Sequence, residues 1–353
     1  MKDKAASFKT AAVFIGTVVG AGLASGQEVL QFFTLYGFYG IIGIVICGLL
    51  YILTGVITVD LSYKHKATSY NDLIYLSCGE LLGSVVDVLT TLFLFGSTVI
   101  ILAGSGSLFL ESLGIPKIVG IIVMAVLTLS AVLYSTKGLI FINSIIVPCM
   151  ITVIAIISVN VFLNKSISLP PVGYKIINAP VYKEKWFLST LLYMSFNMLS
   201  ATGVLSPMTR DINSPKAMVN GTILGAVGLF FLTGIMDIIL LLNEPVIFNY
   251  SIPMLYIAST ISTGIKIALS VVMWLEMFST AVSDTYSLAK KINHSFNIGY
   301  KKSAIMILIL AFPFTWLGFK RLITFLYPIY GAVSLIYMFC LIFFYFEENR
   351  KRI

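Results

Sequence analysis

The segment GTVVGAGLASGQE, residues 16–28, decides how the rest of the sequence is interpreted. It lies within an apolar stretch, residues 9–33, long enough to cross a bilayer core of about 30 Å as a helix. Its glycines, at positions 16, 20, 22 and 26, fall where a membrane helix should be most regular. Glycine weakens a helix and lets the backbone approach a ligand, whereas unpaired peptide groups in lipid are costly. The segment therefore predicts a helix that is interrupted beside a polar cavity.

The composition is that of an integral membrane protein. Of the 353 residues, 58% are hydrophobic and only 11% are charged, and the mean hydropathy is +0.99. Soluble domains carry about 25% charged residues. We therefore expect an all-α membrane protein of about ten transmembrane helices. The ten predicted spans are residues 9–33, 36–59, 84–110, 116–134, 139–163, 186–207, 218–242, 262–289, 303–317 and 322–346, the ninth being short and containing Pro313.

The basic residues indicate topology rather than nucleic-acid binding. The net charge is +8, but Lys and Arg lie mainly between the apolar stretches and form no run interleaved with aromatic residues. Most of them fall in the connections that share a side with both termini, so the positive-inside rule predicts cytoplasmic termini. The four cysteines show no CxxC spacing, which argues against a disulfide framework or a metal knuckle. No cleavable leader is expected before the first helix.

A long polar connection, residues 164–185, divides the chain into residues 1–163 and 186–353, each with five predicted spans. Because five is odd, the halves enter the membrane from opposite sides, and any likeness between them is an inverted repeat. The first span of the second half contains SFNMLSATGVLSP, residues 195–207, with polar and small residues at mid-span. Paired interruptions in corresponding spans are typical of a transporter's binding site. Close packing between helices is the alternative interpretation of these small residues.

GTVVGAGLASGQE resembles the first helix of the YkvI-type bacterial membrane proteins of the amino acid–polyamine–organocation (APC) superfamily, which share the leucine-transporter (LeuT) fold. The length and span count also fit, and the resemblance is specific in the first, sixth and eighth spans. It implies two inverted five-helix repeats, first and sixth helices broken at mid-membrane, and alternating access. It also implies a bacterial cytoplasmic membrane location.

The resemblance further implies a sodium site. In sodium-coupled members, backbone carbonyls of the broken first helix and two hydroxyls of the eighth helix hold one cation. Oxygen ligands suit a hard cation, and the alternative is that these hydroxyls bond back to their own helix. Some relatives use a lysine in the fifth span instead, but residues 139–163 contain neither Lys nor Arg, which favours sodium. The implied ligands are the carbonyls of Gly16, Val19 and Glu276 and the side chains of Ser279 and Thr280.

The expected solute is a small amino acid or a related amine, carried together with sodium and without any other cofactor. A solute carboxylate would meet the peptide groups freed at Gly20, Ala21, Gly22 and Ser25. An amino group would turn toward the sixth span. Glu28 could bind a cationic group, gate the outer vestibule or carry a proton. The candidates on the sixth span are Ser195, Asn197 and Ser200, and further acidic residues at or near membrane depth are Asp87, Asp237, Glu276 and Asp284.

Other functions remain open at this stage. A non-transporting sensor subunit of the germinant-receptor type has a similar size and superfamily, and a proton-coupled transporter would share the same fold. An enzyme is not expected, because His65 and His294 fall in cytoplasmic connections and no nucleophile–base constellation lies in the spans. The expected partners are a small solute and the lipid bilayer, and no nucleic-acid partner is expected. The sequence leaves the number of subunits undetermined.

Overall fold

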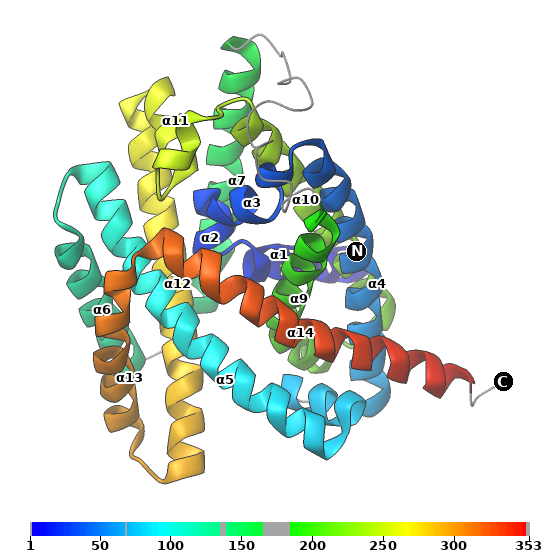
Figure 1. Ribbon diagram of the computed structural model, residues 1–353. Coiled ribbons are helices and arrows are strands. Elements are labelled where there is room, and N and C mark those ends of the chain that lie inside the picture. The colour runs from blue at the N-terminus through cyan, green and yellow to red at the C-terminus, as the bar shows by residue number, and fades with distance from the viewer. Residues whose placement is uncertain (1, 68, 135–138, 165–183, 351–353) are drawn as a thin grey trace.

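The computed structural model describes residues 2–67, 69–134, 139–164 and 184–350, and these residues form helices and short connections without any strand (Figure 1). The first predicted span is divided into three helices, and a short 3-10 turn follows it. The elements of the first half are α1 (Lys2–Val18), α2 (Ala21–Ser25), α3 (Gln27–Phe32), η1 (Thr34–Tyr36), α4 (Phe38–His65), α5 (Tyr70–Leu113), α6 (Lys117–Tyr134) and α7 (Leu139–Asn164).

The second half has five long helices and a short helix on the outer side of the predicted topology. Its elements are α9 (Trp186–Asp211), α10 (Pro215–Leu241), η2 (Val246–Asn249), α11 (Pro253–Ile261), α12 (Thr263–Phe296), α13 (Tyr300–Phe314), η3 (Thr315–Leu317) and α14 (Phe319–Arg350). Most of the connection between the halves, residues 165–183, lies outside the described residues.

Seven helices of the described chain are long and apolar enough to cross a membrane: α4, α5, α9, α10, α12, α13 with η3, and α14. The short ninth span reaches this length because its helix begins at Tyr300, before the predicted start, and continues to Leu317. Shorter apolar stretches lie in α6 and α7, at Lys117–Leu133 and Pro148–Leu163. The first predicted span is the one that the structure divides into short pieces.

The stretch between the second and third predicted spans, residues 61–83, is mostly helical, because α4 continues to His65 and α5 begins at Tyr70. Ser69 caps the start of α5, because its hydroxyl accepts the Asp72 N–H while the Asp72 carboxylate accepts the Ser69 N–H. Gly79 then interrupts the helix with a φ of 72°. A short helical segment therefore precedes the long apolar part of α5.

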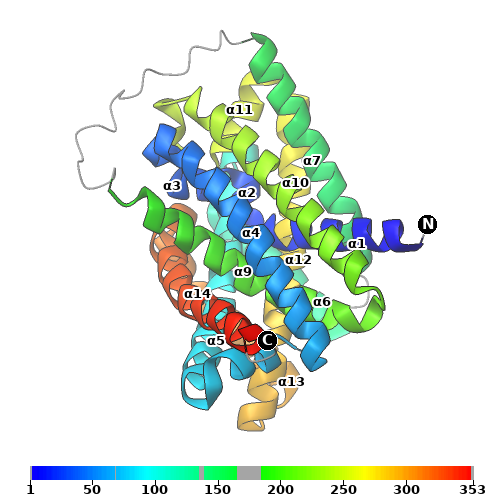
Figure 2. The same cartoon turned by 90° about the vertical axis from the view of Figure 1, so that its right-hand side faces the viewer.

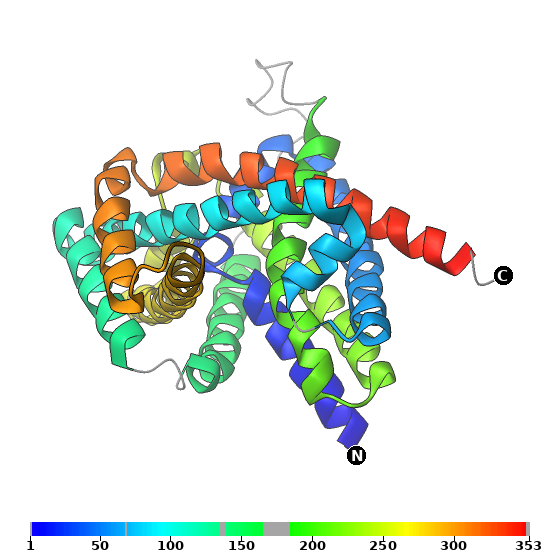
Figure 3. The same ribbon diagram turned by 90° about the horizontal axis from the view of Figure 1, so that it is seen from below.

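The long helices pack in two groups. In one group, α1 and α4 pack against α9 and α10, and in the other α5 and α6 pack against α12 and α13. Figure 2 shows α4 and α10 running side by side, and Figure 3 shows α6 and α13 together at the side away from α1 and α4. The helix α14 contacts α9 in the first group and α5 in the second. Each group therefore combines helices from both halves of the chain.

Small residues bring α1 and α10 close together. A Cβ atom at Gly221 would collide with the backbone of Ser7, and one at Gly225 would press on Phe14. The Ser7 hydroxyl donates to the Ala217 carbonyl across the same contact. Glycines four residues apart let membrane helices approach at backbone distance. This contact places the end of α1, where the first span is broken, inside the first group.

Candidate functional site

The first span is interrupted between Val18 and Ala21. Gly20 has an extended backbone, with φ −94° and ψ −171°, and its N–H donates to the Val18 carbonyl at 2.9 Å. The Val19 N–H still donates to Ile15, which closes the last turn of α1. Of the backbone hydrogen bonds described at this helix end, none uses the carbonyls of Gly16, Thr17 or Val19. The break therefore leaves carbonyl oxygens available to a ligand.

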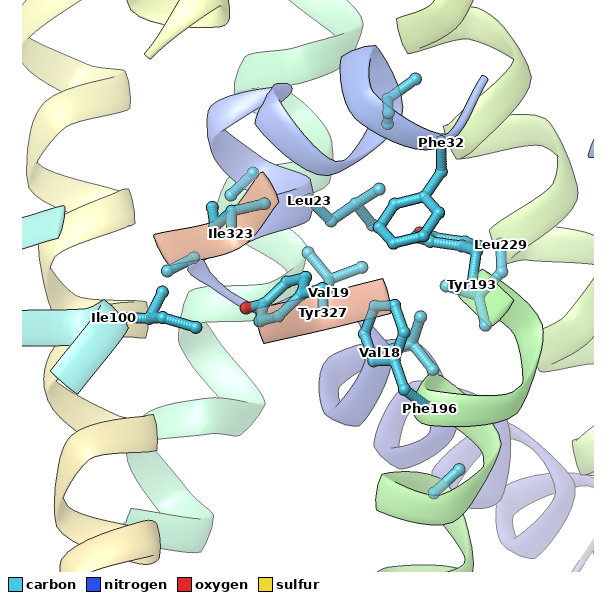
Figure 4. Close-up of a cluster of buried hydrophobic side chains, with 14 of the residues drawn as sticks. Val18, Val19, Leu23, Phe32, Ile100, Tyr193, Phe196, Leu229, Ile323 and Tyr327 are labelled. Atoms are coloured by element: carbon cyan, nitrogen blue, oxygen red, sulfur yellow. The ribbon is translucent and has the colours of Figure 1, made fainter. Parts of the chain in front are cut away.

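The break borders open space as well as packed side chains. A Cβ atom built on Gly20 would meet no atom within 4 Å. Val18 and Val19 are buried, and Figure 4 shows them beside Phe196 of α9 and Tyr327 of α14. An irregular backbone at membrane depth is tolerated where protein or a polar cavity covers it. The predicted interruption near Gly20 is thus present, with room on one side of it.

A second interruption follows at Gly26, which joins α2 to α3. Its φ of 78° lies in the left-handed region, and a Cβ atom there would also crowd Met254 of α11. The Ser25 hydroxyl stabilises this turn, because it donates to the Gly22 carbonyl at 2.7 Å and accepts the Gln27 N–H at 3.1 Å. Ser25 therefore shapes the backbone of the site with both of these hydrogen bonds.

Glu28 folds back from α3 onto α2. A Cβ atom at Gly22 would overlap the Glu28 carboxyl group, so this glycine makes room for the acid. Glu28 is 3% exposed, and its Oε2 atom has no hydrogen-bond partner in the described part of the chain. The neighbouring Gln27 is fully buried, and both atoms of its amide also lack a described partner. Buried polar groups without partners are rare in folded proteins, which makes this corner a candidate ligand site.

Three buried tyrosines from separate helices lie near Glu28. Tyr327 of α14 lies beside its carboxyl group, and Tyr51 of α4 and Tyr193 of α9 are close enough to interact with it electrostatically. The hydroxyls of Tyr51 and Tyr193 have no hydrogen-bond partner among the described residues. Figure 4 shows Tyr193 and Tyr327 with Phe32 and Phe196 around the broken helix. Their ring centroids are 5.4 Å apart for Phe32–Tyr193 and 4.9 Å apart for Phe196–Tyr327.

Sequence reasoning missed Gln27 and these three tyrosines. Gln27 belongs to the ASGQE motif and could have been found as an amide beside the acid in an apolar span. The tyrosines carry no such signal, because the chain has 18 of them and tyrosine is also an ordinary packing residue in membrane helices. Only the packing of α4, α9 and α14 around α2 and α3 brings them to Glu28.

The predicted break in the sixth span is wrong, since α9 is helical from Trp186 to Asp211. Asn197 donates to the Tyr193 carbonyl at 3.1 Å and Ser200 to Phe196 at 3.2 Å, each one turn back along the helix. Such polar side chains satisfy themselves on their own helix and so do not require it to open. The Ser195 hydroxyl lies within hydrogen-bond distance of the Leu192 carbonyl on its own helix, at 3.0 Å, and of the Gly331 carbonyl of α14, at 2.7 Å, so it joins α9 to α14.

The candidate sodium ligands on α12 lie on a buried part of that helix, which packs against α2. Thr280 donates to the Glu276 carbonyl at 3.1 Å, the local hydrogen bond that the alternative interpretation expects. A hydroxyl that donates its proton in this way keeps its lone pairs for a cation. Ser279 is 1% exposed, and the Glu276 carboxyl, which is 3% exposed, has one oxygen without a described partner.

The buried charged residues of the described chain are all acidic: Glu28, Asp237, Glu276 and Asp284. The Thr34 hydroxyl donates to Asp237 at 2.7 Å, which links η1 to α10. Asp87 is different, because Lys291 of α12 forms an ion pair with it. Asp87 therefore has a basic partner, unlike the four buried acids.

No family model matches the chain. Two curated proteins of Bacillus subtilis (strain 168), both described as uncharacterized, are similar over nearly their whole length. The membrane protein YkvI is 27% identical over 96% of this chain and 95% of its own. YyaD is 25% identical over 96% of this chain and 97% of its own.

The structure also resembles solved transporters. The inward-facing form of Mhp1, a nucleobase-cation-symport-1 family transporter, matches with a TM-score of 0.65 and 14% identity, covering 93% of this chain and 75% of that one. MhsT in complex with L-phenylalanine matches with a TM-score of 0.62 and 15% identity, covering 94% and 86%. A Na⁺-coupled sialic acid symporter matches with a TM-score of 0.58 and 13% identity, covering 92% and 75%. At these identities the likeness establishes the fold.

Proposed function

We propose that this protein is a secondary active transporter. It is similar to the membrane protein YkvI over nearly its whole length and has the LeuT-type fold of known symporters. The protein is a sodium-coupled symporter that moves a small amino acid or a related amine by alternating access. The observation that carries this proposal is the break between Val18 and Ala21, with unpaired carbonyls and open space beside Gly20. A helix interrupted at mid-membrane is typical of a transporter's binding site.

The proposed repeats are residues 1–163 and 186–353, joined by residues 164–185. The packing supports this division, because α1 and α4 of the first half pair with their counterparts α9 and α10 in one group. The counterparts α5 and α6 pair with α12 and α13 in the other. Rocking of one group against the other around a fixed site would give alternating access. The protein would lie in the bacterial cytoplasmic membrane with both termini in the cytoplasm.

The proposed solute site lies on the first span. Gly20, Ala21 and Gly22 supply backbone beside the open space, Ser25 holds the turn, and Glu28 supplies charge. Ser195, Asn197 and Ser200 of α9 complete the proposed set, although each already donates a hydrogen bond to a backbone carbonyl. The sixth span would therefore contribute acceptor oxygens and aromatic rings rather than freed peptide groups.

The proposed sodium ligands are the carbonyls of Gly16, Val19 and Glu276 with the hydroxyls of Ser279 and Thr280. The freed carbonyls at the end of α1 support this assignment, because they are strong acceptors that lack a backbone partner there. Oxygen atoms alone suit a hard cation such as sodium.

The test is thermal unfolding of the purified protein with a panel of amino acids and amines, in sodium and in potassium buffers. A ligand that binds the folded state raises the unfolding temperature by mass action. We expect solute and sodium together to raise it more than the sum of their separate effects. Ser279→Ala combined with Thr280→Ala should remove the sodium effect, whereas Ser283→Ala, on an exposed position of α12, should preserve it. Equal shifts in sodium and potassium would contradict sodium coupling.

Uptake of the stabilising solute into proteoliposomes separates the candidate functions. Accumulation driven by an inward sodium gradient supports the symporter. Accumulation driven only by a proton gradient would assign proton coupling instead. Binding without uptake under either gradient would identify a sensor.

A further inference from the structure

Buried acids without buried bases make the interior selective for positive charge. Among the residues whose side chains the structure describes, no Lys, Arg or His is buried, whereas Glu28, Asp237, Glu276 and Asp284 are. An ionisable group within the bilayer requires a partner or a water-filled cavity, because its charge is expensive there. Asp237 receives a hydrogen bond from Thr34, but the Oε2 atom of Glu28 receives none from the described chain. Glu28 therefore has no positively charged partner among the described residues, and a cationic solute could supply that charge.

The surroundings of Glu28 suit an ammonium group. Four separate elements meet there: α3 carries Glu28, and α4, α9 and α14 carry Tyr51, Tyr193 and Tyr327. The tyrosines offer hydroxyl oxygens as acceptors and ring faces that attract cations. A carboxylate accepting from an ammonium forms a short, charge-assisted hydrogen bond, about twice as strong as a neutral one.

The same surroundings disfavour a solute carboxylate. Glu28 folds over Gly22, so a solute carboxylate at the freed peptide groups of α2 would lie next to the Glu28 carboxyl group, and the two could not both be ionised without repulsion. No buried basic side chain of the described chain could offset that repulsion. An amino acid would bring its own carboxylate into this corner, whereas an amine that lacks one would not.

We propose that the solute is a primary or methylated amine without a carboxylate, whose cationic nitrogen binds Glu28 beside Tyr327, with Tyr51 and Tyr193 nearby. This inference rests on the proposed transport function and narrows its substrate class from amino acids and amines to amines alone. Glu28 is the counter-ion, and the tyrosines near it contribute hydroxyl oxygens and aromatic rings to the site.

The test compares solutes that share one side chain and differ in whether they carry an amino group, a carboxylate or both. The purified full-length protein is heated with 3-methylbutylamine, with leucine, and with 4-methylpentanoic acid, and the comparison is extended to phenethylamine, phenylalanine, 3-phenylpropionic acid and choline. We expect at least one amine to raise the unfolding temperature and its carboxylated counterparts to leave it unchanged. Stabilisation by the amino acids but not by the amines would overturn the proposal, as would the absence of any amine-induced shift.

Substitutions at Glu28 and at the neighbouring tyrosines test where the amine binds. Glu28→Gln keeps the shape of the side chain but removes its charge, and should weaken amine binding by about 10- to 100-fold. Glu80→Gln makes the same change at an exposed position of α5 and should bind the amine as the wild type does. If Glu28→Gln does not fold, Tyr193→Phe and Tyr327→Phe test the same site, and each should weaken binding several-fold. If Glu28→Gln, Tyr193→Phe and Tyr327→Phe each bind the amine as tightly as the wild type whenever they fold, the assignment of the amine site to Glu28 is overturned.

Proteoliposome uptake separates this inference from the function on which it rests. An amine that binds through Glu28 but is not accumulated would leave the cation site standing and contradict transport. Accumulation of a neutral solute or of an amino acid, with no response to amines, would leave transport standing and contradict the cation site.

Discussion

The position of the Glu28 carboxyl depends on the absence of a side chain at residue 22. Gly22 lies in the first turn of α2, and the carboxyl group occupies the space that a Cβ atom would need. At Gly20, two residues earlier, the corresponding space is empty. These two glycines look equivalent in the sequence, but the structure gives them different roles.

This difference predicts opposite outcomes for the same substitution. Gly22→Ala must displace Glu28 or shift α2, and should lower the free energy of unfolding by about 1–3 kcal/mol, the usual cost of overpacking. Gly20→Ala adds its methyl group to open space with an allowed backbone angle and should leave the stability nearly unchanged. Thermal unfolding in detergent measures both variants. Equal destabilisation by the two would contradict the described position of Glu28.

Glu244 is a titratable residue outside the spans, in the connection between α10 and η2. Burial raises the pKa of its carboxyl from 4.5 to about 7. The folded protein therefore holds this proton more tightly than the unfolded chain does. The resulting stabilisation is fully present below pH 4.5 and is lost as the pH rises through about 7.

Glu244→Gln should remove this loss, because an amide stays neutral at every pH. We expect the variant to gain about 1 kcal/mol relative to the wild type between pH 5 and pH 8, a value reduced for the partial exposure of the group. Unfolding temperatures at the two pH values give the comparison, with the exposed Glu80→Gln as the control. A wild-type pH dependence in Glu244→Gln would exclude Glu244 as its source.

Among the elements, α11 owes its position to a side chain of another helix. Glu111, near the end of α5, accepts the N–H groups of Ser251 and Ile252 at 3.0 and 3.2 Å, just before α11 begins at Pro253. Since α11 contacts α2 and α12, the carboxylate also fixes a neighbour of the broken span. A helix start without such acceptors would leave amide groups unpaired.

Glu111→Ala should therefore loosen α11 without unfolding the bundle. Removing hydrogen bonds to a charged acceptor costs about 1.5–3 kcal/mol, so amide exchange at residues 251–256 should accelerate by about tenfold or more. Hydrogen–deuterium exchange with mass spectrometry reads this segment directly. Glu80→Ala, on the exposed surface of α5, serves as the control. Unchanged exchange at α11 would show that its packing alone holds it.

The helices α1 and α9 show what a local pattern can and cannot decide. The first span of each half contains small and polar residues near its middle. Of the two helices, only α1 ends at those residues. At Gly20 no side chain can satisfy the backbone, and the chain turns extended. In α9 the side chains of Asn197, Ser200 and Thr202 bond to carbonyls one turn back, and the helix continues through Pro207. Glycine content, rather than polarity, separates the two cases.

Across the whole molecule, the two groups of helices meet at the broken span. The first group contains α1, α4, α9 and α10, and α12 of the second group packs against α2. The helix α14 joins the groups and brings Tyr327 to Glu28. The proposed solute and sodium sites thus lie where the groups would move relative to one another. The exposed outer face of the described chain is rich in large apolar side chains, such as Leu163, Trp316 and Phe343, as expected for contact with lipid.

The sequence by itself determined that this is an all-helical, multi-pass membrane protein and that the first apolar stretch breaks near Gly20. These properties are local, because span length, hydropathy and glycine content act through neighbouring residues and the bilayer. Only the tertiary structure decided that α9 stays continuous, that Asp87 pairs with Lys291, and that tyrosines from α4, α9 and α14 lie near Glu28. Those contacts join residues far apart in the chain, and side chains as common as tyrosine carry no signal of which partner they will meet.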